Sequence, residues 1–135
     1  MSDVFVYGPL QLPAIREAIL GKELPTKPAQ LPGYQAKTLK ELPYPGIQEQ
    51  PEATVQGILI QGLSLTDLTL LDKFQEDHQR TLKEIRTEEQ TVIAAVYEQR
   101  DNNQLSNENW SKETFSYTEF YLQRIIPEFF ENLNK

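Results

Sequence analysis

The chain has 135 residues, enough for one domain with a buried core, and 39% of them are apolar. Its 20 acidic residues outnumber 13 basic ones and give a formal net charge of −7. This balance argues against nucleic acids and anionic membranes as partners, because Lys and Arg are what neutralise phosphate groups. The sequence contains no cysteine, which excludes disulfides, thiolate metal sites and thiol nucleophiles.

The beginning of the sequence lacks a basic region followed by an apolar run of signal length, and no later segment has the composition of a membrane span. We therefore expect a cytoplasmic protein with no membrane partner. The sequence leaves the oligomeric state open, and a monomer is one option.

The first predicted element is a strand in "VFVYGPL" (residues 4–10), which stops at Gly8-Pro9. A strand that ends on such a break can place backbone amides beside a cleft. A short helix is predicted in "LPAIREAILG" (residues 12–21), because Pro13 suits a first turn and Gly21 suits a left-handed end.

Residues 22–51 hold six of the nine prolines, which disfavours a continuous helix or central strand there. We expect a loop, a strand over residues 34–42 and a turn at "PYPG" (residues 43–46). A strong strand, "VQGILIQG", follows at residues 55–62.

The segment "SLTDLTLLDKF" (residues 64–74) predicts an amphipathic helix with Ser64 and Asp67 as a capping box. One face of this helix is expected in the core and carries Leu65, Leu68, Leu71 and Phe74.

A hairpin is predicted over residues 80–86 and 91–99, followed by a polar stretch. In that stretch, Asp101 and Asn103 match the start of a calcium loop, but its glycine and final glutamate are missing. A last helix is expected to open with Ser116 and Glu119 and to be kinked or divided at Pro127. The whole pattern predicts a single α+β domain over residues 1–135, with a mixed, strongly curved sheet.

Two stretches are candidates for chemistry. The first is "VFVYGPL", and the second is "LLDKFQEDHQR" (residues 70–80), where carboxylates follow the negative end of a helix dipole. That position suits a general base and equally suits a solvated acidic loop. His78, the single histidine, is interpreted as a solvated loop residue.

Taken together, these motifs resemble the γ-glutamylcyclotransferase-like family, especially its plant avirulence-induced branch. The family's opening strand, V-F-V-Y-G-S/T-L, is matched by "VFVYGPL", and its later motifs by "LPGYQ", "PYPGI", "VQGILI", "LTLLDKFQEDHQR" and "NENWSKETF", in the same order. The resemblance covers nearly the whole chain.

The resemblance implies an α+β fold built on a small mixed or antiparallel β-barrel, flanked by helices, with a cleft at one end. It also implies a reaction in which the α-amine of a γ-glutamyl amine or peptide attacks its own γ-carbonyl. The products are 5-oxoproline and the released amine. No metal and no organic cofactor is implied, and the implied partner is a small γ-glutamyl compound.

In the binding turn, the resemblance implies substrate-binding roles for Tyr7, Gly8, Pro9 and Leu10, with Pro9 replacing the family's Ser or Thr. Because proline has no N–H, this replacement removes one backbone donor and steers Gly8 toward extended geometry.

At the helix end, Phe74 matches the family, and Gln75 stands at the position of the family's catalytic glutamate. A deletion of one residue would instead put Glu76 there as the base, with His78 near the family's Tyr and Arg80 at its substrate-binding Arg. Three functions remain open: a cyclotransferase with Glu76 as base, a catalytically degenerate small-molecule binder or regulator, and an acidic Ca²⁺-binding protein.

Overall fold

The computed structural model describes residues 2–40 and 44–134. The elements up to the middle of the chain are β1 (Ser2–Val6), the 3₁₀ helix η1 (Pro9–Gln11), α1 (Pro13–Leu20), β2 (Thr26–Leu39) and β3 (Pro45–Leu63). They are followed by α2 (Leu65–Phe74), β4 (His78–Thr87), β5 (Thr91–Gln99), the 3₁₀ helix η2 (Asn102–Gln104), β6 (Leu105–Asn109) and the 3₁₀ helix η3 (Lys112–Thr114). The C-terminal elements are α3 (Thr118–Phe120), the π-helical stretch η4 (Tyr121–Ile125) and α4 (Ile126–Leu133).

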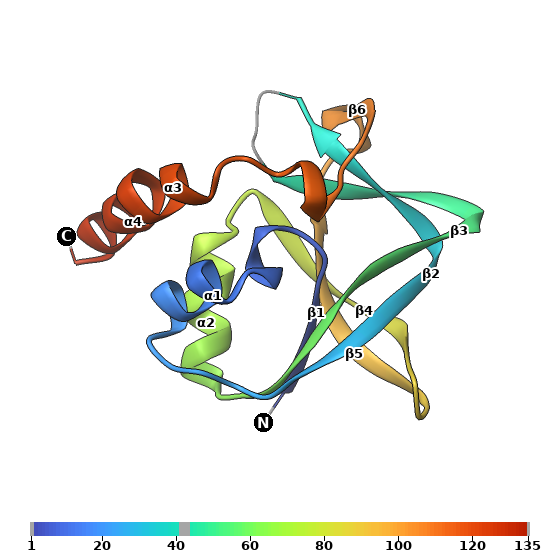
Figure 1. The fold of residues 1–135 in the computed structure, drawn as a ribbon, viewed down its shortest axis with the longest axis horizontal. Coiled ribbons are helices and arrows are strands. Elements are labelled where there is room, and N and C mark those ends of the chain that lie inside the picture. Colours follow the sequence, from blue (N-terminus) through green and yellow to red (C-terminus); the bar gives the residue numbers. More distant parts are fainter. Residues whose placement is uncertain (1, 41–43, 135) are drawn as a thin grey trace.

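The strands form a closed, mixed barrel. Their order is β3-β1-β5-β4-β2-β6, and a further pairing of β2 with β3 closes the first five into a ring. β1 and β5 run parallel, and the other pairs are antiparallel. Figure 1 shows helices α1, α2, α3 and α4 gathered on one side of this barrel. The α+β barrel expected from the sequence is confirmed.

Strand β1 contributes to both halves of the core, because successive side chains of a strand point to opposite faces. Val4 and Val6 pack in a cluster with residues of α1, α2 and α4, while Phe5 and Tyr7 pack with residues of the other barrel strands. All four side chains are buried. The turn that follows β1 is therefore anchored on both of its sides.

Helices α1 and α2 have the predicted ends. Gly21 closes α1 with φ +72°, and its N–H donates to Glu17 O. At the start of α2, Asp67 N–H donates to Ser64 Oγ at 3.1 Å and Ser64 N–H donates to Asp67 Oδ2 at 3.0 Å, which confirms the capping box. The core face is only partly as predicted, since Leu65 is 78% exposed.

Strand β2 is longer than the sequence predicts and includes Pro28 and Pro32. The ladder to β3 is irregular between Pro32 and Tyr34, where Gly33 has φ +86°. Proline is accepted in a strand at positions where its nitrogen owes no ladder bond, such as edges and bulges. The predicted strand end at residue 42 and the first residue of the predicted turn lie outside the described residues.

The C-terminal helix differs from the prediction at its start. It begins after Tyr117, and within the described residues no side chain caps it, so the box expected from Ser116 and Glu119 is not formed. The division near Pro127 is confirmed in another form, because the π-helical turn lies directly before it. A proline removes a helix hydrogen bond, which favours such a local change of winding.

Candidate functional site

A small cavity lies where the turn after β1, the start of β3 and the end of α2 meet. Its lining residues come from segments far apart in the sequence: Phe5, Val6, Tyr7, Gly8, Pro9, Leu10, Tyr44, Pro45, Gln75 and Tyr97. Gly8, Tyr44 and Gln75 are half-buried and the others are buried, so these three mark the side that faces solvent.

The volume of this cavity open to water-molecule centres is about 20 Å³. On this measure a single water needs roughly 10–15 Å³. The enclosed part of this cavity therefore has room for about one water molecule.

The turn itself opens with Pro9 as the first residue of a 3₁₀ helix. The first N–H groups of a helix have no partner within it, so a proline here removes no structural hydrogen bond. Gly8, before it, has φ −109° and ψ −147°, outside the helical region. Pro9 thus fits the local backbone. Because it has no N–H, a ligand at this turn loses one possible hydrogen bond.

The side chains of Gln11 and Arg16 hold the turn through hydrogen bonds to its backbone carbonyls. Gln11 Nε2 donates to the carbonyl oxygens of Tyr7 at 2.7 Å and Gly8 at 3.3 Å. The buried Arg16 donates through Nη1 to Leu10 O and Gln11 O, both at 3.1 Å. With these carbonyls engaged, the turn is fixed before any ligand arrives. We did not predict these roles from the sequence, although a charged residue on the apolar face of a helix was a signal.

The end of α2 brings Gln75 into the cavity wall. Gln75 is the C-cap of the helix, where its N–H donates to Leu71 O at 2.9 Å and its own carbonyl accepts from His78 N at 2.9 Å. The side chain of Glu76 is exposed and is not among the lining residues described, and its backbone carbonyl accepts from Arg100 Nε at 3.2 Å. Catalytic roles for either residue stay predictions.

His78 is buried, so its interpretation as a solvated loop residue is wrong. Its ring packs against Tyr44 with centroids 5.3 Å apart, and Nε2 lies 3.0 Å from Pro45 O. Burial lowers the pKa of His78 below its ordinary value. The neutral ring must carry its proton on Nε2 in order to donate to that carbonyl. His78 therefore holds the start of β3 against the cavity.

Two tyrosines of the cavity wall each donate to an aspartate. Tyr44 donates to Asp77 Oδ2 at 2.5 Å, and Tyr97 donates to Asp72 Oδ1 at 2.6 Å. The pKa of each tyrosine is raised, first by burial and then by its aspartate. Both hydroxyls therefore stay protonated at neutral pH.

Arg80, predicted to bind substrate, is connected to this wall through Asp72. Its Nη2 pairs with Asp72 Oδ2 at 3.5 Å, and it is not among the residues described as lining the cavity. A direct contact between Arg80 and a ligand stays a prediction. The sequence did not predict its connection to Tyr97 through Asp72.

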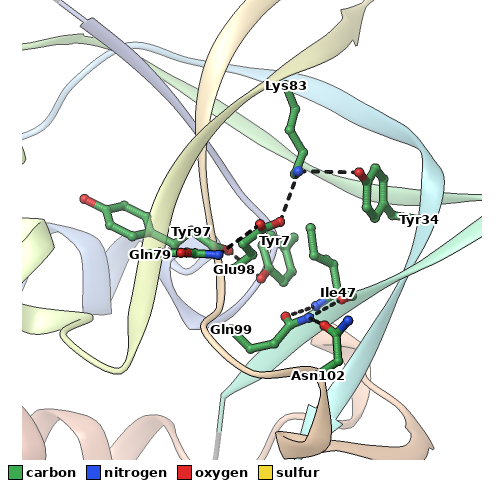
Figure 2. A network of polar contacts seen from close by, with 9 residues as sticks. All are labelled: Tyr7, Tyr34, Ile47, Gln79, Lys83, Tyr97, Glu98, Gln99 and Asn102. Atoms are coloured by element: carbon green, nitrogen blue, oxygen red, sulfur yellow. Dashed lines mark hydrogen bonds and ion pairs between the residues drawn. The ribbon is translucent and has the colours of Figure 1, made fainter.

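A second polar network stiffens the barrel beside the cavity (Figure 2). Lys83 pairs with Glu98 at 3.0 Å and reaches Tyr34 Oη at 3.4 Å. Burial lowers the pKa of Lys83, but the hydrogen bond and charge of Glu98 outweigh that and raise it. Closer to the cavity, Tyr7 donates to Tyr97 O at 2.6 Å, which ties β1 to β5.

Among residues 2–40 and 44–134, no group of three or more His, Cys, Asp or Glu side chains is placed to hold a metal ion. Nor does any helix in this part of the chain combine the length and apolar character of a membrane span.

Residues 4–114 match the family model described as gamma-glutamyl cyclotransferase, AIG2-like. Protein AIG2 C from Arabidopsis thaliana is 38% identical over 84 residues, which span 62% of this chain and only 51% of that protein. AIG2-like protein C from the same plant is 29% identical over 140 residues, covering 93% of this chain and 81% of the relative.

Solved structures agree with this match. A solution structure from Arabidopsis thaliana has a TM-score of 0.70 and 29% identity, covering 98% of this chain and 81% of its own. A structure named gamma-glutamyl cyclotransferase shares the fold, with a TM-score of 0.62 and 15% identity, covering 74% of this chain and 67% of its own. The chain belongs to the AIG2-like gamma-glutamyl cyclotransferase family.

Proposed function

We propose that this chain binds a small γ-glutamyl amine or peptide in the cavity beside Gly8 and cyclises it to 5-oxoproline, releasing the amine. One observation carries the proposal: the Tyr7–Leu10 turn and Gln75, the two positions to which the family pattern assigns binding and catalysis, line the same cavity. The family membership supports a cyclotransferase-like role.

The turn offers backbone N–H groups to the polar end of the substrate. Pro9 supplies none, so the N–H groups of its neighbours Gly8 and Leu10 are left for this task. A turn already fixed by Gln11 and Arg16 loses little freedom on binding. Holding the α-amine against the γ-carbonyl supplies much of the catalysis, because orientation converts the attack into a favourable intramolecular step.

The weak point of the site is position 75. The amide of Gln75 is not basic at neutral pH, and loss of a general base typically costs about 10²–10⁴ in rate. We therefore expect slow turnover. The same observation favours a second candidate function, a γ-glutamyl-binding protein without turnover, because Gln75 lines the cavity while the side chain of Glu76 is exposed.

An end-point assay separates the two functions. The wild-type protein is incubated with a series of γ-glutamyl amines and peptides, and the amounts of 5-oxoproline and of released amine are both measured. The control is Glu128→Gln, which removes an exposed ion pair of α4. Stoichiometric products support the cyclotransferase. Calorimetric binding of the same compounds with no product supports the binder, and neither binding nor product contradicts both.

A further inference from the structure

We propose that Tyr97 and Asp72 form the proton-accepting pair of this site, in place of a carboxylate at position 75; this rests on the cyclotransferase function proposed above. Tyr97 would be the group that touches the substrate amine, and Asp72 would act through it.

The geometry of Tyr97 suits this role. It lines the cavity together with Gly8 and Gln75, and it lies on β5, paired in the barrel between β1 and β4. Its hydroxyl donates to Asp72 Oδ1 at 2.6 Å, while its backbone carbonyl accepts from Tyr7 Oη at 2.6 Å. Because both its hydroxyl and its backbone carbonyl are hydrogen-bonded, Tyr97 can present its hydroxyl oxygen in one position.

Asp72 connects this hydroxyl to solvent. It lies in the last turn of α2, its side chain is 42% exposed, and its second carboxylate oxygen lies 3.5 Å from Arg80 Nη2. The ion pair orients the carboxylate toward Tyr97, and the exposed edge lets it exchange protons with water. The series of contacts from Arg80 through Asp72 to Tyr97 therefore runs from the surface to the cavity wall.

The proposed step needs no other reactant. As the nitrogen of the neutral α-amine forms its bond to the γ-carbonyl carbon, one of its two protons passes to Tyr97 Oη, and the tyrosine's own proton passes to Asp72 Oδ1. When the bond from that carbon to the leaving nitrogen breaks, the same proton returns through Tyr97 to the leaving nitrogen. Nothing is oxidised or reduced, and the products are 5-oxoproline and the free amine.

The protonation state of Tyr97 agrees with a relay. Burial, and then the hydrogen bond to Asp72, raise its pKa, so the hydroxyl remains a donor rather than a phenolate base. Tyr44, which also lines the cavity, forms a similar pair with Asp77, but it lies at the open side of the cavity, before the first residue of β3. Tyr97, whose side chain is buried in the cluster between the barrel and the helices, is the more enclosed of the two.

The test compares Tyr97→Phe and Asp72→Asn with the wild type in the formation of 5-oxoproline. Phenylalanine keeps the packed ring, and asparagine keeps an oxygen that accepts from Tyr97. We expect kcat to fall about 10²-fold or more in both variants, with KM changed less than threefold and unfolding midpoints close to the wild type. Asp77→Asn is the matched comparison across the cavity, and Glu128→Gln is the neutral control.

A rescue experiment excludes a merely structural role. Gln75→Glu puts a carboxylate directly in the cavity wall, so the double variant Gln75→Glu with Asp72→Asn should recover most of the activity lost in Asp72→Asn. Its pH–rate profile should also differ from that of the wild type, since a different group accepts the proton.

Four other outcomes would show that Tyr97 and Asp72 are not the proton-accepting pair. Full activity in Asp72→Asn, loss only in Asp77→Asn, failure of the rescue, or activity in Gln75→Glu but not in the wild type would each exclude the relay while leaving γ-glutamyl chemistry in place. If neither the wild type nor Gln75→Glu forms 5-oxoproline from any compound, the proposed function fails as well.

Discussion

Gly8 packs against Pro45 so closely that no side chain fits between them. A Cβ atom on Gly8 would lie 2.9 Å from Pro45 Cδ and 3.1 Å from Cγ. The turn at Gly8 and the start of β3 are thus in direct contact beside the cavity. His78 holds the same proline from the other side, through its carbonyl oxygen.

The contact makes Gly8→Ala a sensitive probe of the site. The added methyl must push Pro45 away, and we expect a loss of about 1–3 kcal/mol in the free energy of unfolding together with weaker binding of γ-glutamyl compounds. The measurements are urea unfolding and calorimetry.

Gly21→Ala is the control for that variant. Its Cβ would meet nothing within 4 Å, but its φ of +72° makes alanine unfavourable by roughly 1–2 kcal/mol. It should therefore lower stability without changing affinity. Equal losses of affinity in both variants would contradict a specific role for the Gly8 contact.

Pro9→Ser restores the residue type that the family has at this position, and with it an N–H group beside the cavity. We expect affinity for γ-glutamyl compounds to rise about tenfold, near the lower end of the roughly 1.5–3 kcal/mol contributed by hydrogen bonds to charged groups. Stability should fall by about 0.4–1 kcal/mol, because proline restricts the unfolded chain. An unchanged affinity, measured by calorimetry, would show that the position-9 N–H does not face the ligand.

Positions 75 and 76 are distinguished by a pair of substitutions. Because Gln75 lines the cavity and Glu76 is exposed, we expect Gln75→Ala to weaken binding or turnover at least tenfold and Glu76→Gln to change them less than twofold. Steady-state kinetics, or calorimetry if turnover is absent, measures both. The reverse result would instead support Glu76 as the base.

His78 gives stability a defined pH dependence. Its pKa is lowered in the folded protein by burial, so below its ordinary value of about 6.5 the unfolded chain binds the proton more readily. The stability contributed by neutral His78 is complete above that value and is lost as the pH falls toward the folded pKa. The limiting slope is about 1.4 kcal/mol per pH unit.

Urea unfolding between pH 7.5 and 5 measures this dependence. We expect the free energy of unfolding to fall on acidification in the wild type. The fall should be smaller in His78→Gln, since the chain has no other histidine. The same slope in both proteins would contradict a buried, neutral His78.

Local patterns predicted the parts of this site that depend on neighbouring residues. The strand before Gly8, the capping box at Ser64 and the end of α2 at Phe74 follow from apolar spacing and capping chemistry that act within a few residues. The family resemblance then indicated that the turn and the helix end belong to one site.

What the sequence did not predict depends on contacts between distant segments. His78 is buried because Tyr44 and Pro45 cover it, and Asp72 reaches Tyr97 because α2 lies against the barrel. Pro28 and Pro32 lie within a strand because of where its partners lie, and proline content alone indicated a loop. None of these relations leaves a periodic signal in the sequence.

NMR mapping of amide shifts shows whether γ-glutamyl compounds bind at the Tyr7–Leu10 turn. The probe is a glutaric acid monoamide that carries the amine of a γ-glutamyl compound found to react or bind. This probe lacks the attacking α-amine and cannot form 5-oxoproline. We expect saturable shifts at the amides of Gly8 and Leu10 and at the side-chain amide of Gln75. Shifts confined to the Lys83–Glu98 network, or none at millimolar ligand, would contradict binding at this turn.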